Sequence, residues 1–359
     1  MEVGILLFLV KILAYLLRKK LFCDINIMMK RLEKKMDIKN EKADIKENNI
    51  LNIDPIILSI LLKDRTTNKN IIWATDNYKS KGFKYRENDS IEIELITGKN
   101  GNTIKPRIEK NKKEQQYRAR DKAEVFTPSW VCNAQNNLID EAWFGRKNVF
   151  NTEIDNGWKS NKEKIIFPQN KKWQDYVQDT RLEISCGEAP YIVSRYDTVT
   201  GKVIKIKDRI GLLDRKLRII DENTVTKEEW LNWAEIAFKN VYGYDWQGDN
   251  VLIARENLLF TLIDYYMGKF KEEVDKPTLI MFAEIISWNI WQMDGLKFVV
   301  PNSCKNKTIE QMSFFGKAVQ GVKCAGCESG NPLKHNGKQC KIMDWKKNKK
   351  VKYVSLIGG

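Results

Sequence analysis

Carboxylates, small residues and a Cys–Gly pair are the groups in this sequence whose types and spacing could do chemistry. The central stretch runs Leu182-Glu183-Ile184-Ser185-Cys186-Gly187-Glu188-Ala189-Pro190-Tyr191. Its apolar lead-in predicts a strand that ends at an acidic residue and a turn of small residues. Such residues let a backbone approach a ligand closely, and Gly187 can adopt positive φ at a sharp turn. A strand ending in this way is also common as plain structure, so both interpretations stay open on this stretch alone.

Two acids later in the sequence also follow short apolar runs, as Glu183 does in the central stretch. Val241-Tyr242-Gly243-Tyr244-Asp245 and the segment from Trp288 to Asp294 are short apolar runs that each end in an acid. Helical periodicity is expected over 228–241 and again over 251–265. Strands that alternate with helices in this way predict a parallel α/β sheet whose ligand lies at the carboxyl ends of the strands. Each acid could instead be a helix cap or an exposed loop carboxylate.

A Thr-Pro pair precedes the central stretch. Pro128 suits the first turn of a helix that runs through Leu138 and Ile139, with Thr127 as its N-cap. An ordinary capped helix accounts for this pattern. The functional alternative is that the free N–H groups at the helix start face a carboxylate.

Cysteines and the single histidine gather near the end of the sequence. Cys324 and Cys327 have Cys-x2-Cys spacing, His335 and Cys340 follow, and Cys304 lies upstream. The pair of sulfurs, with Cys340 and either His335 or Cys304, could form a tetrahedral zinc site. The predicted ligand set is Cys324, Cys327, His335 and Cys340. A second Cys-x2-Cys is missing, and free buried or loop thiols are the alternative.

The charge balance favours a polyanionic partner. The 359 residues include 62 Lys and Arg against 47 Asp and Glu, a net charge of +15. Nucleic acid is the leading candidate partner, and a Lys-rich proteome is the competing explanation. Residues 105–122 are especially basic and form either a solvated face or a stripe that contacts phosphates. Seven cysteines, an odd number, with no evident cleavable signal favour a reduced cytoplasm.

The sequence suggests four regions. Residues 1–49 form an apolar and charged leader, 50–120 a small mixed α+β region, 121–301 a Rossmann-like domain, and 302–359 a Cys-containing end. In the second region we expect a helix over 55–62 and strands over 71–74 and 91–96. The apolar run Met1–Leu17 is shorter than a bilayer span and predicts a surface or buried helix, or a start codon placed too far upstream. No stable membrane association is expected.

In their order, the motifs Phe126-Thr127-Pro128, 182–191, 242–245 and 289–296 resemble those of γ-type adenine-N6 DNA methyltransferases of restriction–modification systems. The similarity spans about Asn52 to Trp345 and extends to restriction endonuclease M subunits. It implies a Rossmann-like α/β sheet that binds S-adenosylmethionine and acts on double-stranded DNA.

The resemblance also implies a role for each motif residue. Glu183 would accept hydrogen bonds from the methionine ammonium, and Ser185, Cys186 and Gly187 would form the turn over which the cofactor lies. Asp245 would bind the ribose hydroxyls and Asp294 the adenine amine. Thr127 would lie near the methionine carboxylate.

This sequence departs from the family pattern in two places. About 59 residues separate Cys186 from Asp245, which predicts an insertion at 196–220 that could contact DNA through basic side chains (Arg209, Arg215, Lys216 and Arg218). The family's catalytic Asn/Asp-Pro-Pro-Tyr/Phe is absent, and Asn331-Pro332-Leu333 lacks the aromatic residue that would stack on a flipped base.

Two functions follow from these motifs. The first is an adenine-N6 DNA methyltransferase that is truncated before its catalytic motif and binds cofactor without methylating alone. The second is a non-catalytic DNA- or partner-binding module of a restriction system, completed by another chain.

Overall fold

A computed structural model describes residues 47–356, with gaps at 123, 125–126 and 314–315 and without the side chains of 121–122 and 307–322. Contacts divide the chain between Asp44 and Ile45, and only the second unit, 45–359, is described below. The apolar run Met1–Leu17 lies outside the described residues. Among the helices that are described, none combines the length and apolar character that crossing a membrane requires.

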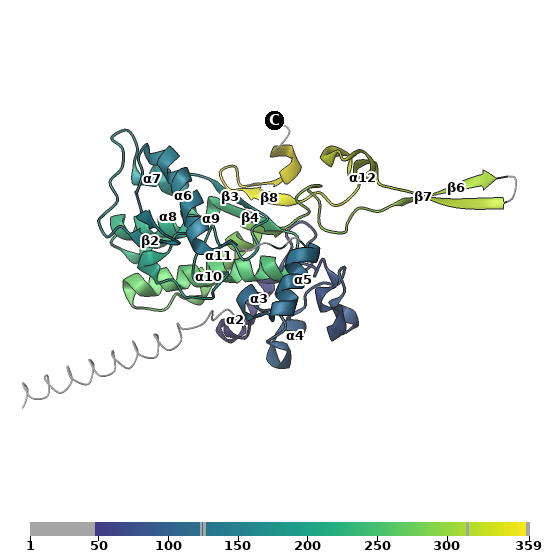
Figure 1. Cartoon of the computed structure of the whole chain (residues 1–359), viewed down its shortest axis with the longest axis horizontal. Helices are drawn as coiled ribbons and strands as arrows, with labels where there is room; N and C mark the ends of the chain where they lie inside the picture. The colour runs from purple at the N-terminus through teal and green to yellow at the C-terminus, as the bar shows by residue number, and fades with distance from the viewer. Residues whose placement is uncertain (1–46, 123, 125–126, 314–315, 357–359) are drawn as a thin grey trace, which may run out of the picture. The chain divides into compact units, whose positions relative to one another are not determined.

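Three short parallel strands form the central sheet, and they confirm the expected parallel α/β organisation. They are β3 (Arg181–Ile184), β4 (Val241–Asp245) and β5 (Ile290–Gln292), in the order β3-β4-β5. Glu183 lies opposite Gly243, and Asp245 opposite Gln292. The carboxyl ends of the strands therefore share one edge of the sheet (Figure 1).

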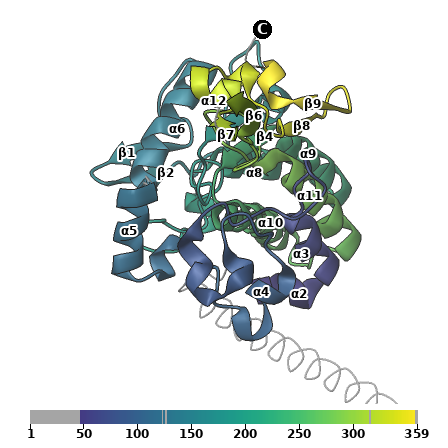
Figure 2. The ribbon, with the colours of Figure 1, turned by 90° about the vertical axis from the view of Figure 1, so that its right-hand side faces the viewer.

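Helices surround this sheet and connect its strands (Figures 1 and 2). After β3 the chain forms α8 (Leu212–Asn223) and α9 (Lys227–Lys239), and α10 (Gly248–Phe270) and α11 (Lys276–Asn289) lie between β4 and β5. Thr226 caps α9 by accepting a 3.2 Å hydrogen bond from the Glu229 N–H, and the Asp275 carboxylate caps α11 at the Thr278 N–H (2.8 Å). The remaining helices are α2 (Glu47–Ile53), α3 (Pro55–Leu62), α4 (Ile93–Ile96), α5 (Lys112–Lys122), α6 (Ser129–Phe144), α7 (Trp173–Gln178) and α12 (Ala325–Ser329).

Three antiparallel hairpins complete the described strands. They are β1 (Asn151–Ile154) with β2 (Gly157–Ser160), β6 (Lys307–Ser313) with β7 (Gly316–Val322), and β8 (Lys341–Asp344) with β9 (Lys349–Lys352). Residues from β8 and beyond cover one face of the sheet, because Tyr244 and Trp291 pack there with Ile342 and Tyr353. The Tyr244 and Tyr353 ring centroids lie 5.8 Å apart.

Strand β3 is an edge strand among the described residues, since it pairs only with β4. Its side chains Leu182 and Ile184 are 42% and 64% exposed. The apolar character that predicted a strand here therefore does not correspond to complete burial.

The strands expected over 71–74 and 91–96 are not formed. The segment 71–74 makes only an isolated bridge, between Ile72 and Ser90, and 91–96 contains the helix Ile93–Ile96 rather than a strand. Ile91, Leu95 and Ile96 are buried, a spacing that suits one side of a helical turn. The alternation in this short segment was therefore misleading.

The structure also changes the interpretation of the basic side chains in 196–220, which were expected to contact DNA. Arg215 and Lys216 are buried, and Arg215 forms an ion pair with Asp140 while Lys216 donates to the carbonyl of Asn240 (3.2 Å). Arg209 is paired with Asp264 and Arg218 with Glu222. The strand pairing within 196–220 is a single antiparallel bridge between Tyr196 and Val203. The prediction that this set contacts DNA is wrong for the buried Arg215 and Lys216, whose charges are used inside the fold.

Candidate functional site

A cavity of about 760 Å³ opens at the carboxyl edge of the sheet. Six of the residues selected from the sequence line it: Thr127, Glu183, Ser185, Cys186, Gly187 and Asp245. They come from the start of α6, the end of β3 with its turn, and the end of β4. The volume lies within the range of about 300–1,000 Å³ that small-molecule sites occupy.

The turn after β3 is held against β4 by backbone hydrogen bonds. Ser185 and Gly187 have φ of 51° and 53°, a left-handed conformation that glycine adopts without steric cost. The Cys186 N–H donates to the Tyr244 carbonyl (2.8 Å), and the Gly187 N–H donates to Asp245 Oδ2 (3.0 Å). The turn and the acid of the next strand therefore form one unit.

Glu183 is buried beside this turn. Its carboxylate accepts from the N–H groups of Ile192 (3.1 Å) and Tyr191 (3.4 Å), and burial raises its pKa well above the usual value. These bonds fix the path of the chain after Pro190. The carboxylate thus has a structural task as well as a place on the cavity wall.

Asp245 is also buried, and burial raises its pKa to about 6. Besides the Gly187 bond, its Oδ1 accepts from the Gln247 N–H (2.8 Å). Oδ1 also lies 3.5 Å from the Asn250 Nδ2 donor, and because each carboxylate oxygen can accept two hydrogen bonds, Oδ2 retains acceptor capacity. Asn250, on the first turn of α10, also lines the cavity, and its buried Oδ1 has no hydrogen-bond partner.

The start of α6 differs from the sequence prediction. Helix α6 begins after Pro128, which occupies the cap position, so the predicted N-cap role of Thr127 is wrong. The Ser129 N–H instead donates to Asp197 Oδ2 (2.7 Å). The helix start does face a carboxylate, as the functional alternative required, but this carboxylate belongs to the protein itself.

Asp294 lies outside the main cavity, in a neighbouring hollow of about 390 Å³. Ile184, Ser185 and Trp246 line both spaces. The Asp294 carboxylate accepts from the N–H groups of Leu296 and Lys297 and forms an ion pair with Lys297 Nζ (3.3 Å). The structure therefore places Asp294 next to the other six residues rather than among them.

The cavity wall is acidic. Among the described residues that line it, none is Lys, Arg or His, whereas five are acids: Glu87, Glu124, Glu183, Glu188 and Asp245. The lining residue Glu124 forms an ion pair with the buried Arg118, and both Arg118 and Lys110 bind the buried Asp249. A wall of one sign concentrates its potential in the cavity and favours a positively charged or donor-rich ligand.

Sequence reasoning missed several lining residues, including Glu87, Glu188 and Asn250. Asn250 had a detectable signal, because it begins the helix that follows an acid-terminated strand. Glu87 had none, since it reaches the cavity from a segment about 100 residues away from β3 in the chain.

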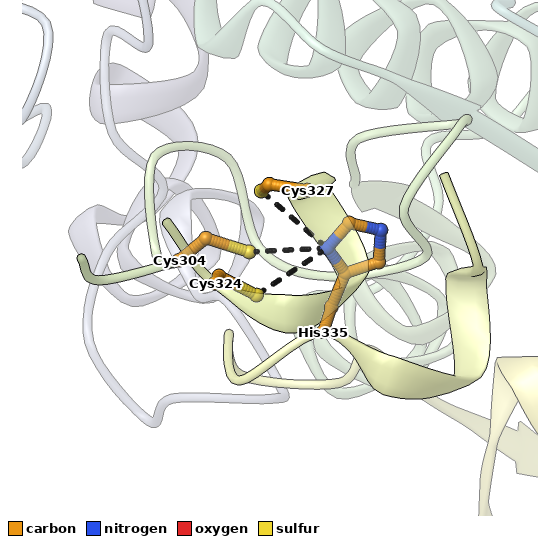
Figure 3. A group of neighbouring side chains, drawn as sticks. All are labelled: Cys304, Cys324, Cys327 and His335. Atoms are coloured by element: carbon orange, nitrogen blue, oxygen red, sulfur yellow. Dashed lines mark hydrogen bonds between the residues drawn. The ribbon is translucent and has the colours of Figure 1, made fainter. Parts of the chain in front are cut away.

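A second group of side chains lies between the end of β5 and β8. Cys304, Cys324, Cys327 and His335 bring their ligand atoms within 4.8 Å of one another, and this group could hold a metal ion. Figure 3 shows the three sulfurs directed at one ring nitrogen. The amide N–H of Asn336 donates to the Cys324 sulfur (3.2 Å), which lowers the pKa of that thiol to about 6.

The predicted metal ligand Cys340 is wrong. Cys340 is fully buried in the apolar cluster with Tyr244 and Trp291, where its thiol points at the Gln292 carbonyl (3.5 Å). Cys304 takes the fourth position instead. Both Cys304 and Cys340 were candidate ligands from the sequence. Which of them lies beside His335 depends on the path of the loops in the folded chain.

Comparison with known proteins gives no match of any kind: no family model, no curated protein and no solved structure is similar to this chain.

Proposed function

We propose that the cavity at the carboxyl edge binds S-adenosylmethionine, and that the chain is the cofactor-binding part of an adenine-N6 DNA methyltransferase of a restriction–modification system. One observation carries the proposal. Six residues that the motif resemblance selects, spread from Thr127 to Asp245, line a single cavity. These residues come from three separate segments of the chain, and the resemblance assigns all of them to one ligand.

The charge of the wall supports this ligand over other nucleosides. S-adenosylmethionine carries a sulfonium and an ammonium, and its ribose hydroxyls and adenine amine are hydrogen-bond donors. Five carboxyl groups, with no cationic side chain among the lining residues that the structure describes, suit such a ligand. ATP and dinucleotides, by contrast, bring phosphates that need cations or free N–H groups, and this wall would repel them.

In the proposed complex, each polar residue of the wall binds one part of the ligand. Asp245 accepts from the ribose hydroxyls through its remaining lone pairs, and the unpartnered Oδ1 of Asn250 is a further acceptor nearby. Glu183 keeps the turn in place through Ile192 and accepts a hydrogen bond from the methionine ammonium, whose positive charge would favour the ionised form of this buried carboxyl. Thr127 and Tyr191 supply hydroxyl donors for the methionine carboxylate.

Methyl transfer needs groups that this sequence lacks. In the adenine methyltransferases that the chain resembles, a side-chain amide and a proline carbonyl bind the target amine, and an aromatic ring stacks on the flipped base. The only Asn-Pro here, at Asn331-Pro332, belongs to the loop between Cys327 and His335 rather than to the sheet edge. We therefore propose binding of cofactor and DNA, with transfer dependent on a second chain that supplies the tetrapeptide.

Calorimetric titration of the full chain with S-adenosylmethionine tests the proposal. We expect saturable binding to the wild type, at least a tenfold loss in Asp245→Asn, and no loss in Asp155→Asn, an exposed acid in the β1–β2 turn. An excess of ATP should not compete. Absence of binding, competition by ATP, or an unchanged Asp245→Asn would contradict the cofactor assignment.

A methylation assay separates the two parts of the proposal. With DNA and labelled cofactor we expect no transfer by the chain alone, whether or not cofactor binds. Transfer by the isolated chain would show that it supplies its own catalytic groups and would refute the requirement for a second chain.

A further inference from the structure

We propose that Cys304, Cys324, Cys327 and His335 bind one structural zinc ion, and that this ion joins the two ends of the β6–β7 hairpin. The site is separate from the cofactor cavity, since none of its four residues lines that cavity. It is therefore independent of the proposed methyltransferase function.

The three sulfur–nitrogen distances are those of a zinc tetrahedron, and all four ligand atoms lie within 4.8 Å of one another. The three sulfurs lie 3.6, 3.8 and 3.6 Å from His335 Nδ1, for Cys304, Cys324 and Cys327 respectively. Bonds of about 2.3 Å to sulfur and about 2.1 Å to nitrogen, at the tetrahedral angle, separate the two atoms by about 3.6 Å. A single imidazole nitrogen is one donor or one acceptor and cannot serve three thiols at once, whereas an ion between the four atoms accounts for all three contacts.

The donor set selects the metal. Three thiolates and one imidazole in a closed tetrahedron are a typical structural zinc set, whereas magnesium and calcium require oxygen ligands. The backbone also fits this role. The Asn336 N–H donates to the Cys324 sulfur, and Gly326 lets the chain pass close to the ring, since a Cβ at Gly326 would lie 2.6 Å from His335 Nδ1.

The position of the ligands in the chain indicates what the ion does. Cys304 lies three residues before β6, and Cys324 lies two residues after β7, so they sit at the two ends of one hairpin. Figure 1 shows β6 and β7 running together from the α12 segment. Cys327 and His335 then fasten this base to the loop that follows. The Asn336 side chain joins the same two segments by exchanging hydrogen bonds with the backbone of Lys305 (2.7 and 3.0 Å).

The described part of 302–339 has little apolar core of its own that could hold the two ends of the β6–β7 hairpin together. Between 302 and 339 the described buried side chains include only Cys324 and His335, while Lys305, Lys323, Lys334 and Lys338 are exposed. Small segments without a core are commonly stabilised by a metal, and the binding free energy then becomes folding free energy.

Metal analysis of the full chain, purified without chelator, tests the proposal. We expect one zinc per chain in the wild type and in Cys340→Ser, and loss of most of the zinc in Cys304→Ser. Cys340→Ser is the matched control, because it removes a buried thiol close in sequence that lies outside the tetrahedron. Zinc loss in Cys340→Ser with retention in Cys304→Ser would overturn the ligand assignment.

A second measurement does not depend on the folding of variants. Cobalt added to the metal-depleted wild type should give the visible bands of a tetrahedral thiolate site, and zinc should abolish them. Limited proteolysis should cleave between 304 and 324 faster in the metal-depleted chain, and added zinc should restore protection. A chain that neither contains zinc nor gives the cobalt bands would refute the site, and unchanged cleavage would refute the role at the hairpin.

Discussion

At the scale of single residues, the informative group is the buried carboxylate of Asp245. Two backbone N–H groups hold it in place, yet burial still raises its pKa to about 6. Against an ordinary value of 3.8, this difference corresponds to about 3 kcal/mol of cost when the folded protein carries the charge. A group kept at such a cost is more typical of a ligand site than of a structural turn.

The first prediction concerns the pH dependence that this carboxylate imposes. Between about pH 4 and pH 6 the folded state keeps the Asp245 proton that the unfolded state has lost. The contribution of Asp245 to the free energy of unfolding therefore falls as pH rises through this range. Asp245→Asn should remove that part of the slope. Urea unfolding at several pH values measures it, with Asp155→Asn as the control, and equal slopes in wild type and Asp245→Asn would contradict the prediction.

The same linkage should govern binding of the proposed cofactor. A ligand that donates hydrogen bonds to ionised Asp245 should bind more tightly as pH rises toward 6, with little further gain above it. Binding at pH 5.5 should release a proton, which calorimetry in buffers of different ionisation enthalpy detects. A flat affinity between pH 5 and 7 would show that Asp245 does not contact the ligand.

At the scale of elements, buried ion pairs join α5 to α10. Asp249 in the first turn of α10 accepts from Tyr78 Oη (2.7 Å) and pairs with Arg118 (2.8 Å) and Lys110 (3.4 Å). Burial by itself would raise the pKa of Asp249, but the two cations outweigh burial and lower it. Arg118 also binds Glu124, a residue of the cavity wall. The network thus positions one side of the cavity.

Replacing Asp249 by Asn should therefore be costly. Asp249→Asn leaves Lys110 and Arg118 buried with less compensation, and we expect a loss of about 3 kcal/mol in the free energy of unfolding at pH 7. Asp76→Asn breaks an exposed pair with Lys79 and should cost less than about 1 kcal/mol. Because the pKa of Asp249 is lowered in the fold, its contribution is present above about pH 4 and fades in acid. Denaturant titration at pH 7 and pH 3 compares the two variants. Equal losses of unfolding free energy in Asp249→Asn and Asp76→Asn would contradict the structural role of Asp249.

At the scale of the whole molecule, the charge distribution has two parts. The chain carries a net +15, yet the cavity wall is acidic. Several basic side chains that the sequence suggested for contact with phosphates are buried in the fold, among them Arg118, Arg215 and Lys216. Lys112 and Lys113 at the start of α5, however, are exposed. We therefore expect a DNA phosphate backbone to contact α5. Arg118 of the same helix forms an ion pair with Glu124, which lines the cavity.

We predict that α5 contributes to DNA binding. The double variant Lys112→Gln/Lys113→Gln should bind duplex DNA more weakly, and the slope of log affinity against log salt should become shallower by about 2. Lys159→Gln/Lys162→Gln carries the same charge change on exposed residues near β2 and serves as the control. Fluorescence anisotropy over a salt series measures both slopes. Equal changes in the two double variants would mean that net charge, rather than α5, determines binding.

Local periodicity by itself determined β4 and the helices α6, α9 and α10, and the acid-terminated strands placed Glu183 and Asp245 at one sheet edge. Short-range patterns suffice there because the spacing of buried side chains repeats along a single element. The tertiary structure decided the rest. It put Cys304 rather than Cys340 beside His335, turned 91–96 into a helical turn, and buried Arg215 against Asp140. Cys304 lies 31 residues from His335 and Arg215 lies 75 residues from Asp140, so these partners depend on the three-dimensional path of the chain.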